Sequence, residues 1–488
     1  MEEAGPERVG VDPAPFRGYE EAMALVVKRS LISGCASVAM RKGKVFHSGC
    51  WGSADLETGA KFGFDTLCRM VCATKSYVAV AFMALVEEGL ASPDDRLDTY
   101  IPAFAGVQVR VEGSDRLVAP KRPILLKHLM SHTSGIGYSG DVSDRLEDLD
   151  PDTASYQRAL NAVISGKTRS LAAFVSQLAK VPLSFHPGYK YQYSFAFDVL
   201  GRVVEIVSGK RLDRCLQDYV FGPLGMKSTM WAAPDSQLDR LAAYYANSST
   251  CKSLYGGLKG RKSRGKLCRI DGRSARESHW RKGRQAKVLS GGGYLGYVYG
   301  GMLSTVRDTV AFVKMLYNYG KLENGCRLLK KSTVMAMEKN RLSAKTSGDD
   351  RVCYLGNIGT YREGSSEYGM GGAACTYWNI DRADETAAVW FTQNCDMPEF
   401  DEFTDPKKAD MWAVMHQAPS RSSCQSAAAA TAALPPRESG NMHGSKRGHD
   451  GGDESATQPA PQAVLSASKK RPRAPTSASA GAKRARRS

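Results

Sequence analysis

The stretch Arg69-Met70-Val71-Cys72-Ala73-Thr74-Lys75-Ser76-Tyr77 opens an apolar segment that continues to Val86. A nucleophilic side chain three residues before a lysine, in the first turn of a buried helix, places Cys72 and Lys75 on one helix face. The lysine amine can then accept and return the proton of the nucleophile, and the helix N-terminus favours an anion there. Residues 249–252 and 466–469 also place a serine three residues before a lysine, but both lie in polar segments. The apolar helix that follows is therefore what distinguishes the Cys72 site.

Outward from this helix, the sequence predicts strands at both ends of the chain. Residues 36–40 and 44–51 flank Arg41-Lys42-Gly43 and predict a β-hairpin, and residues 374–380 and 386–392 predict two more strands. Helical patterns are expected over 16–32, over most of 72–320 and over 407–416. The sequence therefore predicts an α+β fold, in which an antiparallel sheet built from the N- and C-terminal segments is flanked by helices and carries an inserted all-helical domain.

The net charge of +17 over 488 residues is concentrated in two segments. Residues 252–287 contain 13 Lys+Arg and 2 Asp+Glu, and residues 419–488 contain 12 Lys+Arg and 4 Asp+Glu, so the rest of the chain is close to neutral. The composition predicts an N-terminal extension (1–14), one main domain (15–418) with a solvated basic insertion loop (252–287), and a disordered basic tail (419–488).

The chain shows no sign of membrane insertion or secretion. The most apolar run, residues 77–86, is far shorter than a bilayer requires, and the N-terminus lacks the basic and apolar regions of a secretory signal. We therefore expect a cytoplasmic or nuclear protein without a membrane partner, whose twelve cysteines are free thiols.

Four short motifs are given no function. The glycines of Gly291-x-Gly293-x-x-Gly296 lack a strand-turn-helix context, and residues 166–168 lack the first glycine of a phosphate-binding loop. The pair His128 and His132 lacks the intervening glutamate of a zinc protease, and no second pair of ligands accompanies Cys68 and Cys72. We therefore expect no metal and no cofactor.

A series of motifs in order resembles the β-lactamase-related serine hydrolases, which include class C β-lactamases, penicillin-binding-protein-like enzymes and a carboxylesterase branch. The resemblance covers roughly residues 15 to 418. The matching segments are Cys72-Ala73-Thr74-Lys75 for S-x-[TS]-K, residues 85–89, 95–102, 128–136, Pro187-Gly188, Tyr193-Ser194, 198–202, 223–226, 300–305, and Tyr368-Gly369-Met370-Gly371-Gly372-Ala373.

The resemblance implies a site and a reaction. Cys72 would attack the carbonyl carbon of a small ester, thioester or amide to form an acyl-enzyme, and Lys75 and Tyr193 would share the proton transfers. The backbone N–H groups of Cys72 and Ala373 would form the oxyanion hole, where charge develops in the transition state. The segment Met370-Gly371-Gly372 would contact substrate.

Three departures from the family pattern affect this expectation. The nucleophile is Cys72 instead of serine, Phe195 stands where β-lactamases have asparagine, and Met370 replaces a lysine, histidine or tryptophan. Because Met370 cannot donate a hydrogen bond to a carboxylate, turnover of penicillin-type anions is not expected. Two hypotheses stay open: a cysteine acyl-transfer enzyme, or a catalytically degenerate member that binds a ligand or partner. Redox sensing by Cys72, an ion-pair role for Lys75 and a packing role for Tyr193 are further alternatives.

The tail indicates a second class of partner. Lys469-Lys470-Arg471-Pro472-Arg473 and Lys483-Arg484-Ala485-Arg486-Arg487 resemble a two-part nuclear-import signal, or a contact for a polyanion. The alternative is a solubilising tail. The loop 252–287 contains few aromatic residues, so binding of single-stranded nucleic acid by base stacking is not expected.

Overall fold

The computed structural model describes residues 3–139, 145–247, 263–264, 267–271, 290–293, 301–343, 352–357 and 366–395. All of them belong to one unit, residues 1–431. The predicted closing helix (407–416), the tail (419–488) and most of the basic insertion lie outside the described residues.

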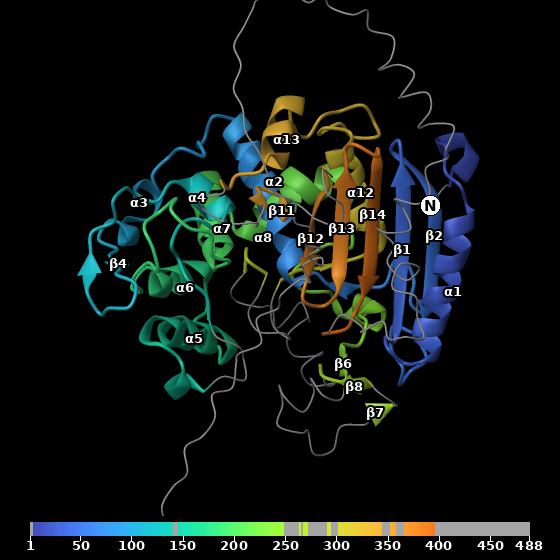
Figure 1. The fold of residues 1–488 in the computed structure, drawn as a ribbon, viewed down its shortest axis with the longest axis horizontal. Helices are drawn as coiled ribbons and strands as arrows, with labels where there is room; N and C mark the ends of the chain where they lie inside the picture. Colours follow the sequence, from blue (N-terminus) through green and yellow to red (C-terminus); the bar gives the residue numbers. More distant parts are fainter. Residues whose placement is uncertain are drawn as a thin grey trace, which may run out of the picture. The chain divides into compact units, whose positions relative to one another are not determined.

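The main sheet has seven strands in the order β10-β11-β12-β13-β14-β1-β2, and neighbouring strands are antiparallel (Figure 1). The strands are β1 (Gly34–Arg41), β2 (Lys44–Gly52), β10 (Val352–Cys353), β11 (Gly356–Asn357), β12 (Tyr368–Gly372), β13 (Thr376–Asp381) and β14 (Thr386–Thr392). Pairing of β1 with β14 runs from Cys35↔Thr392 to Arg41↔Thr386. The prediction that both ends of the domain build one antiparallel sheet is confirmed.

The β1–β2 hairpin forms where the sequence predicts it. Its two turn residues, Lys42 and Gly43, have φ values of 50° and 73°. Two left-handed residues in succession give the turn twist that suits a two-residue hairpin, and glycine adopts this conformation without strain.

Helices cover both faces of the sheet, and the side chains of β1 therefore alternate between two hydrophobic cores. Ala36, Val38 and Met40 pack in the larger core, which contains α2 and α12, whereas Cys35 and Ala39 pack in a smaller core with α1. Successive side chains of a strand point to opposite faces, so a strand that is covered on both faces is buried along its whole length, here including the polar Ser37 and Arg41. All eight residues of β1 are buried.

The helices fall into a sheet-covering group and an inserted group. They are α1 (Ala14–Lys28), α2 (Thr74–Glu87), α3 (Leu97–Tyr100), α4 (Leu126–Met130), α5 (Pro151–Ile164), α6 (Leu171–Leu178), α7 (Ala196–Ser208), α8 (Leu212–Leu216), α9 (Gly222–Leu224), α12 (Val306–Tyr317) and α13 (Lys331–Glu338). Figure 1 shows α2 between the inserted helices α3 to α7 and the strands of the sheet. Every residue of α2 from Thr74 to Leu85 is buried, as expected for a helix that is enclosed on all sides.

The insertion is mostly helical rather than all-helical, because it contains the short pair β4 (Val109–Arg110) and β5 (Leu117–Val118). Two further small sheets lie outside it: β3 (Cys68–Arg69) pairs with β9 (Leu303–Ser304), and β6 (Tyr245–Asn247) pairs with β8 (Leu267–Arg269), which pairs with β7 (Ser263–Arg264).

The prediction that residues 252–287 form a solvated loop is wrong for residues 267–271. Leu267, Ile270 and Asp271 are buried, and β8 is the central strand of its sheet. A short apolar pattern within a basic run is sufficient for a strand when its charged residues find partners. Arg269 and Asp271 provide that pairing, because Arg269 Nε donates to Asp271 Oδ1 at 2.8 Å.

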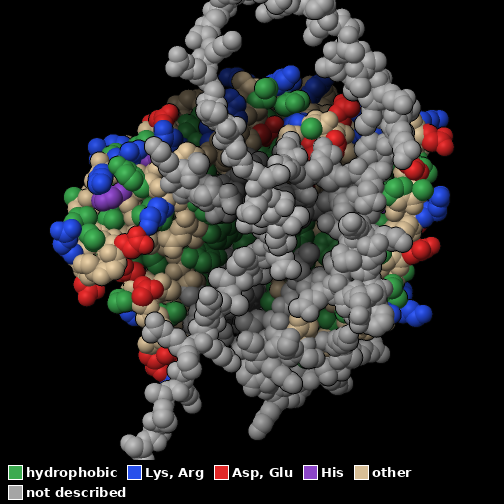
Figure 2. Space-filling view, viewed as in Figure 1, with side chains coloured by type: hydrophobic (Ala, Val, Ile, Leu, Met, Phe, Trp, Pro, Cys, Tyr) green, Lys and Arg blue, Asp and Glu red, His purple; other side chains and the backbone are tan. Residues whose placement is uncertain are grey.

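The N-terminal extension (1–14) packs onto the domain. Residues Pro6–Val9 form a single 3-10 turn, Val9 and Val11 are buried in the smaller core, and Ala4 N–H donates to Val45 O at 2.8 Å. Figure 2 shows positive and negative side chains intermixed over the described part of one face. Across the described ranges, every helix is too short or too polar to cross a bilayer.

Candidate active site

Cys72 lies in the 3-10 turn Val71–Ala73, between β3 and α2, two residues before the helix begins, whereas the sequence predicts it in the first turn of the helix. Its side chain is partly exposed. The preceding residue, Val71, has a φ of 44°, which is unfavourable for a β-branched residue. Such strain is typical of functional sites, where the surroundings fix the conformation.

Three glycines from separate segments fix this turn. A Cβ atom at Gly293 would lie 1.8 Å from Val71 O, and one at Gly372 would lie 2.1 Å from Met70 O. Gly301 has a φ of 80°, and a Cβ atom there would lie 3.0 Å from Val71 Cα. The backbone on both sides of Cys72 is therefore enclosed by chain that only glycine allows to approach so closely.

Lys75 stands in the first turn of α2 and is buried. Its Nζ donates a hydrogen bond to Gly292 O and lies 4.5 Å from the centre of the Tyr193 ring. Burial lowers the pKa of Lys75, and this effect is opposed by the nearby Cys72 and Asp198. A lysine with a lowered pKa has a larger neutral fraction, which is the form that accepts a proton.

Tyr193 precedes α7 and faces the same group. Burial raises the pKa of Tyr193 well above its ordinary value, and the charge of the Cys72 side chain raises it further. Its hydroxyl is buried and has no partner at standard hydrogen-bond geometry among the described residues, so the interaction with the Cys72 sulfur is a looser one. The structure thus brings the three predicted catalytic residues together around one sulfur atom.

His132 holds the Tyr193 ring in place. The two rings stack with their centres 4.6 Å apart at 26°, and His132 Nδ1 accepts from the Ser194 N–H at 3.2 Å. Burial, together with the positive charge of Lys75, lowers the pKa of His132 well below its ordinary value, so the ring is neutral. His132, considered only as a possible metal ligand from the sequence, is therefore a packing platform for Tyr193.

Asp198 begins one of the segments that match the family, residues 198–202, but no role in the site was predicted for it. It is buried on α7, and its Oδ1 accepts from Ser290 Oγ at 2.6 Å. Ser290 Oγ also accepts from the Gly293 N–H at 2.8 Å, and the Gly292 backbone contacts the Asp198 carboxylate. Burial raises the pKa of Asp198 to about 6, against the opposing effects of Ser290 and Lys75. Asp198 therefore supplies a negative charge beneath Lys75 and anchors the segment that Lys75 contacts.

The predicted substrate segment, Met370-Gly371-Gly372, lies at the end of β12, and Ala373 stands in the turn after it. Gly372 brings β12 against the turn that holds Cys72, and Ala373 packs with Cys72 against a small cluster around Val71 and Tyr244. The two residues predicted for the oxyanion hole thus pack against the same cluster, with Ala373 in a turn. Met370, which was predicted to contact substrate, has its side chain buried in the main core rather than exposed beside Cys72. Gly371 is half-buried on the opposite face of the strand.

Arg69, three residues before Cys72, is enclosed by a network of polar groups. It is fully buried, and its Nη2 donates to Asp271 Oδ2 at 2.9 Å. Its Nη1 donates to Ala242 O at 2.8 Å, and its backbone N–H donates to Gln393 Oε1 at 2.8 Å. The chain just before Cys72 is therefore tied, through Arg69, to Asp271, two residues after the end of β8.

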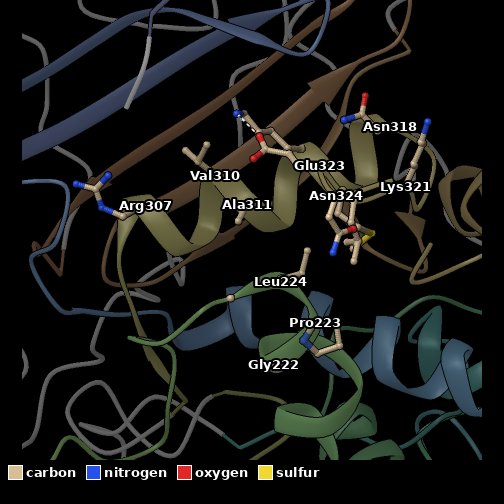
Figure 3. Close-up of a pocket in the computed structure, with 14 residues that line it drawn as sticks. Gly222, Pro223, Leu224, Arg307, Val310, Ala311, Asn318, Lys321, Glu323 and Asn324 are labelled. Carbon is tan, nitrogen blue, oxygen red and sulfur yellow. Dashed lines mark hydrogen bonds and ion pairs between the residues drawn. The ribbon is translucent and has the colours of Figure 1, made fainter. Parts of the chain in front are cut away.

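A cavity of about 440 Å³ elsewhere in the structure contains none of these residues (Figure 3). It lies between α9 and α12, and the Lys314–Glu323 ion pair of 2.7 Å stands at its wall. Because its lining residues include no described member of the Cys72 cluster, we do not assign it to the site.

A sheet with helices on both faces and a mostly helical insertion is the architecture of several solved hydrolases and acyltransferases. EstCE1, a hydrolase with promiscuous acyltransferase activity, superimposes with a TM-score of 0.61 at 22% identity and covers 83% of this chain and 98% of its own. Simvastatin synthase (LovD) from Aspergillus terreus superimposes with a TM-score of 0.62 at 21% identity and covers 82% of this chain and 96% of its own. At sequence identities of 21–22%, these structural similarities establish the fold of this chain and nothing about its activity.

The family follows from the sequence match. The chain belongs to the beta-lactamase family, whose profile matches residues 20–410. Esterase EstB from Burkholderia gladioli is 35% identical over 205 residues, which are 41% of this chain and 47% of EstB, so the match spans about half of that relative. Monacolin J acid methylbutanoyltransferase from Aspergillus terreus is 27% identical over 251 residues, 48% of this chain and 57% of that protein.

Proposed function

We propose that this protein is an esterase or acyltransferase that acts on a small ester, thioester or amide through an acyl-enzyme on Cys72. The observation that carries the proposal is that one thiol interacts with both a buried lysine and a buried tyrosine, which also contact each other. The similarity to esterases and to a methylbutanoyltransferase supports this class of reaction.

In the first half-reaction, the Cys72 thiol loses its proton to the neutral amine of Lys75. The sulfur then forms a bond to the substrate carbonyl carbon, while the backbone N–H groups of Cys72 and Ala373 receive the negative oxygen. The bond from carbon to the leaving group breaks, and Tyr193 passes a proton to the leaving oxygen or nitrogen, which Lys75 replaces.

In the second half-reaction, water or an acceptor alcohol attacks the thioester carbonyl. The same Lys75–Tyr193 pair accepts the proton of the attacking group, and the Cys72 thiol leaves with a proton returned. Hydrolysis and acyl transfer differ only in the attacking group, so the accessibility of water decides between them. Asp198 takes no proton from substrate in this scheme and serves to position Lys75.

The decisive experiment measures the rate of Cys72 alkylation by iodoacetamide against pH, in the protein as it stands and with Lys75→Ala. An activated thiol shows an inflection near neutral pH, because the proton it loses is held by Lys75 as an ammonium beside the thiolate. The inflection moves to higher pH when Lys75 is replaced by alanine. A slow reaction with the midpoint of free cysteine in both proteins would leave only the hypothesis of a binding protein without turnover.

A second experiment tests turnover itself. A screen of short-chain aryl esters, with the protein and with Cys72→Ser, is expected to give an acyl-enzyme that mass spectrometry places on residue 72. The serine variant restores the nucleophile of the family and separates a poor nucleophile from a defective site. Absence of an acyl-enzyme in both proteins would reject the enzymatic proposal.

The basic tail supports a separate proposal, that residues 419–488 bind a nuclear-import receptor or a polyanion through the two Lys/Arg clusters. The test compares the cellular distribution of the full-length protein with that of a chain ending at Ser420. The truncated chain is expected to lose nuclear content, and an unchanged distribution would reject the import signal.

A further inference from the structure

A second cavity, of about 630 Å³, lies beside Tyr193 in the inserted region. It is bordered by the β4–β5 hairpin, the N-terminus of α5 and the segment before α7. Its aromatic lining residues are Tyr138, Tyr156, Phe185 and Tyr191. We call it the Tyr191 cavity. Its volume is within the range of sites that bind small organic ligands.

Two of these aromatic residues connect the Tyr191 cavity to the site. The Tyr138 ring meets the Tyr193 ring edge-to-face with their centres 5.7 Å apart, and Tyr138 packs against the same cluster as Cys72 and Ala373. Tyr191 is near enough to Tyr193 to raise the pKa of its hydroxyl, after the larger effects of burial and Cys72. The inner wall of the cavity is thus formed by direct neighbours of Tyr193.

This position determines which part of a substrate would enter. In the proposed reaction Tyr193 protonates the leaving oxygen, so that oxygen must come within hydrogen-bond distance of the phenol. The carbonyl oxygen points instead to the N–H groups of Cys72 and Ala373. The alcohol side of the ester therefore extends past Tyr193 toward Tyr138 and Tyr191.

The charges of the cavity wall disfavour an anion. The charged lining residues are Arg110, Glu112, Asp115, Asp150, Asp152 and Lys190, four acids and two bases. Both bases are already paired, because Arg110 Nη2 lies 2.9 Å from Asp152 Oδ1 and Lys190 Nζ lies 2.7 Å from Glu112 Oε2. A wall with two more acids than bases and several aromatic side chains favours organic cations, since aromatic rings and carboxylates both attract positive charge.

Asp150 contributes a fixed part of this charge. Its Oδ1 accepts from the N–H groups of Asp152 and Thr153 at 3.1 and 3.0 Å, as the N-cap of α5. Burial alone would raise the pKa of Asp150, but these hydrogen bonds lower it overall, so the carboxylate is ionised at neutral pH. Because asparagine caps a helix about as well as aspartate does, the charge can be removed without loss of the cap.

We propose that the Tyr191 cavity binds the alcohol part of the substrate, and that it selects a bulky alcohol without negative charge and prefers a cationic amino alcohol. This inference rests on the proposed esterase function and names its substrate class.

The experiment compares four butyrate esters by the release of butyrate: methyl butyrate, butyrylcholine, its uncharged carbon isostere 3,3-dimethylbutyl butyrate, and 2-sulfoethyl butyrate. All four form the same acyl-enzyme, so differences in kcat/KM arise in the acylation step. We expect butyrylcholine to exceed its isostere by about tenfold at low salt, as a cation beside aromatic rings predicts. The sulfonate is expected to be the poorest substrate, and 0.5 M NaCl should narrow these differences.

Three variants test the location. Ser184→Trp, an exposed position on the cavity wall, should reduce kcat/KM for the bulky esters at least tenfold and leave methyl butyrate unchanged. Asp150→Asn should reduce the preference for the cation about threefold. Its control is Asp213→Asn, which removes a half-buried carboxylate, paired with Arg211, from the first turn of α8, away from the cavity, and should leave the preference for the cation unchanged.

The outcomes separate the two proposals. Failure of all four esters, methyl butyrate included, counts against the esterase function. If the esters are turned over at rates that do not depend on the charge of the alcohol, the Tyr191 cavity does not bind the alcohol part. The same conclusion follows if Ser184→Trp leaves kcat/KM for the bulky esters unchanged. A measurement that needs no turnover is calorimetric binding of benzyltrimethylammonium to the Cys72→Ala protein. Binding should be lost when Ser184→Trp is added, benzenesulfonate should not bind, and failure of the cation to bind also overturns the assignment.

Discussion

Replacement of Gly293 by alanine should disable the site without unfolding the protein. Gly293 has a φ of 74°, and an added Cβ would lie 1.8 Å from Val71 O, 2.6 Å from Val71 C and 2.9 Å from Thr74 Cβ. Since non-bonded carbon and oxygen atoms seldom approach within about 3.3 Å, the Val71 carbonyl must move by roughly 1.5 Å. A misplacement of about 1 Å can cost roughly a hundredfold in rate. We therefore expect esterase kcat/KM and the rate of Cys72 alkylation to fall by about that factor.

Gly209→Ala is the matched control. Gly209 ends α7 with a φ of 65°, and an added Cβ would meet nothing within 4 Å. Both variants carry the strain of a left-handed alanine, about 1–2 kcal/mol, and should unfold at a lower temperature. Only Gly293→Ala should lose reactivity at Cys72. If the two variants react at rates within threefold of each other, the account of the turn as a sterically fixed element is refuted.

Three further predictions concern charges and protons. In the unaltered protein, the free energy of unfolding should fall as the pH rises from about 4 to about 6. Asp198→Asn should remove this fall, as measured by urea titration at each pH. The pKa of Asp198 is raised to about 6, so the folded protein holds a proton that the unfolded chain releases, and a difference of about two pH units corresponds to about 3 kcal/mol. Tyr193→Phe should reduce ester turnover by about 10²-fold or more while it preserves Cys72 alkylation, because the phenol only transfers protons. Asp271→Asn should cost about 3–5 kcal/mol in urea unfolding, because it removes a buried carboxylate that pairs with both Arg69 and Arg269.

Each of these has an outcome that would contradict it. A pH dependence of unfolding that is the same with Asp198→Asn would show that the carboxyl titrates normally. Equal loss of alkylation and turnover in Tyr193→Phe would mean that the ring shapes the site. For Asp271→Asn the comparison is Asp65→Asn, whose partner Arg307 lies 2.7 Å away on the surface. That exposed pair should be worth less than about 1 kcal/mol, and equal losses in the two variants would contradict the role of burial.

The sequence predicted the elements whose signals are local. The hairpin at residues 41–43 has a glycine where the turn requires one, and β14 coincides with the predicted residues 386–392. Cys72 and Lys75 were found because they share one short motif, Cys72-Ala73-Thr74-Lys75, and Tyr193 was found through a second motif that begins with it. β12 escaped prediction as a strand because three of its five residues are glycine, which a strand pattern does not favour.

The features that the sequence did not reveal depend on distant partners. Asp198 is one acidic residue at the start of an amphipathic helix, and its role emerges only when Ser290 and Lys75 lie beside it. The positive φ of Val71 has no sequence signal, since valine is among the residues least expected there. β8 was hidden because the charge of residues 252–287 was interpreted as solvation, whereas Arg269 and Asp271 neutralise each other inside the protein.

The ion pair between Arg69 and Asp271 has a consequence for how this chain can be shortened. The insertion looks dispensable by composition, yet its Asp271 forms a buried ion pair with Arg69, three residues before Cys72. A deletion of residues 252–287 would remove this ion-pair partner of the buried Arg69, so a trimmed protein should be less stable unless Arg69 is exchanged for an uncharged residue. Minimised versions should therefore keep residues 267–271 or change both positions together.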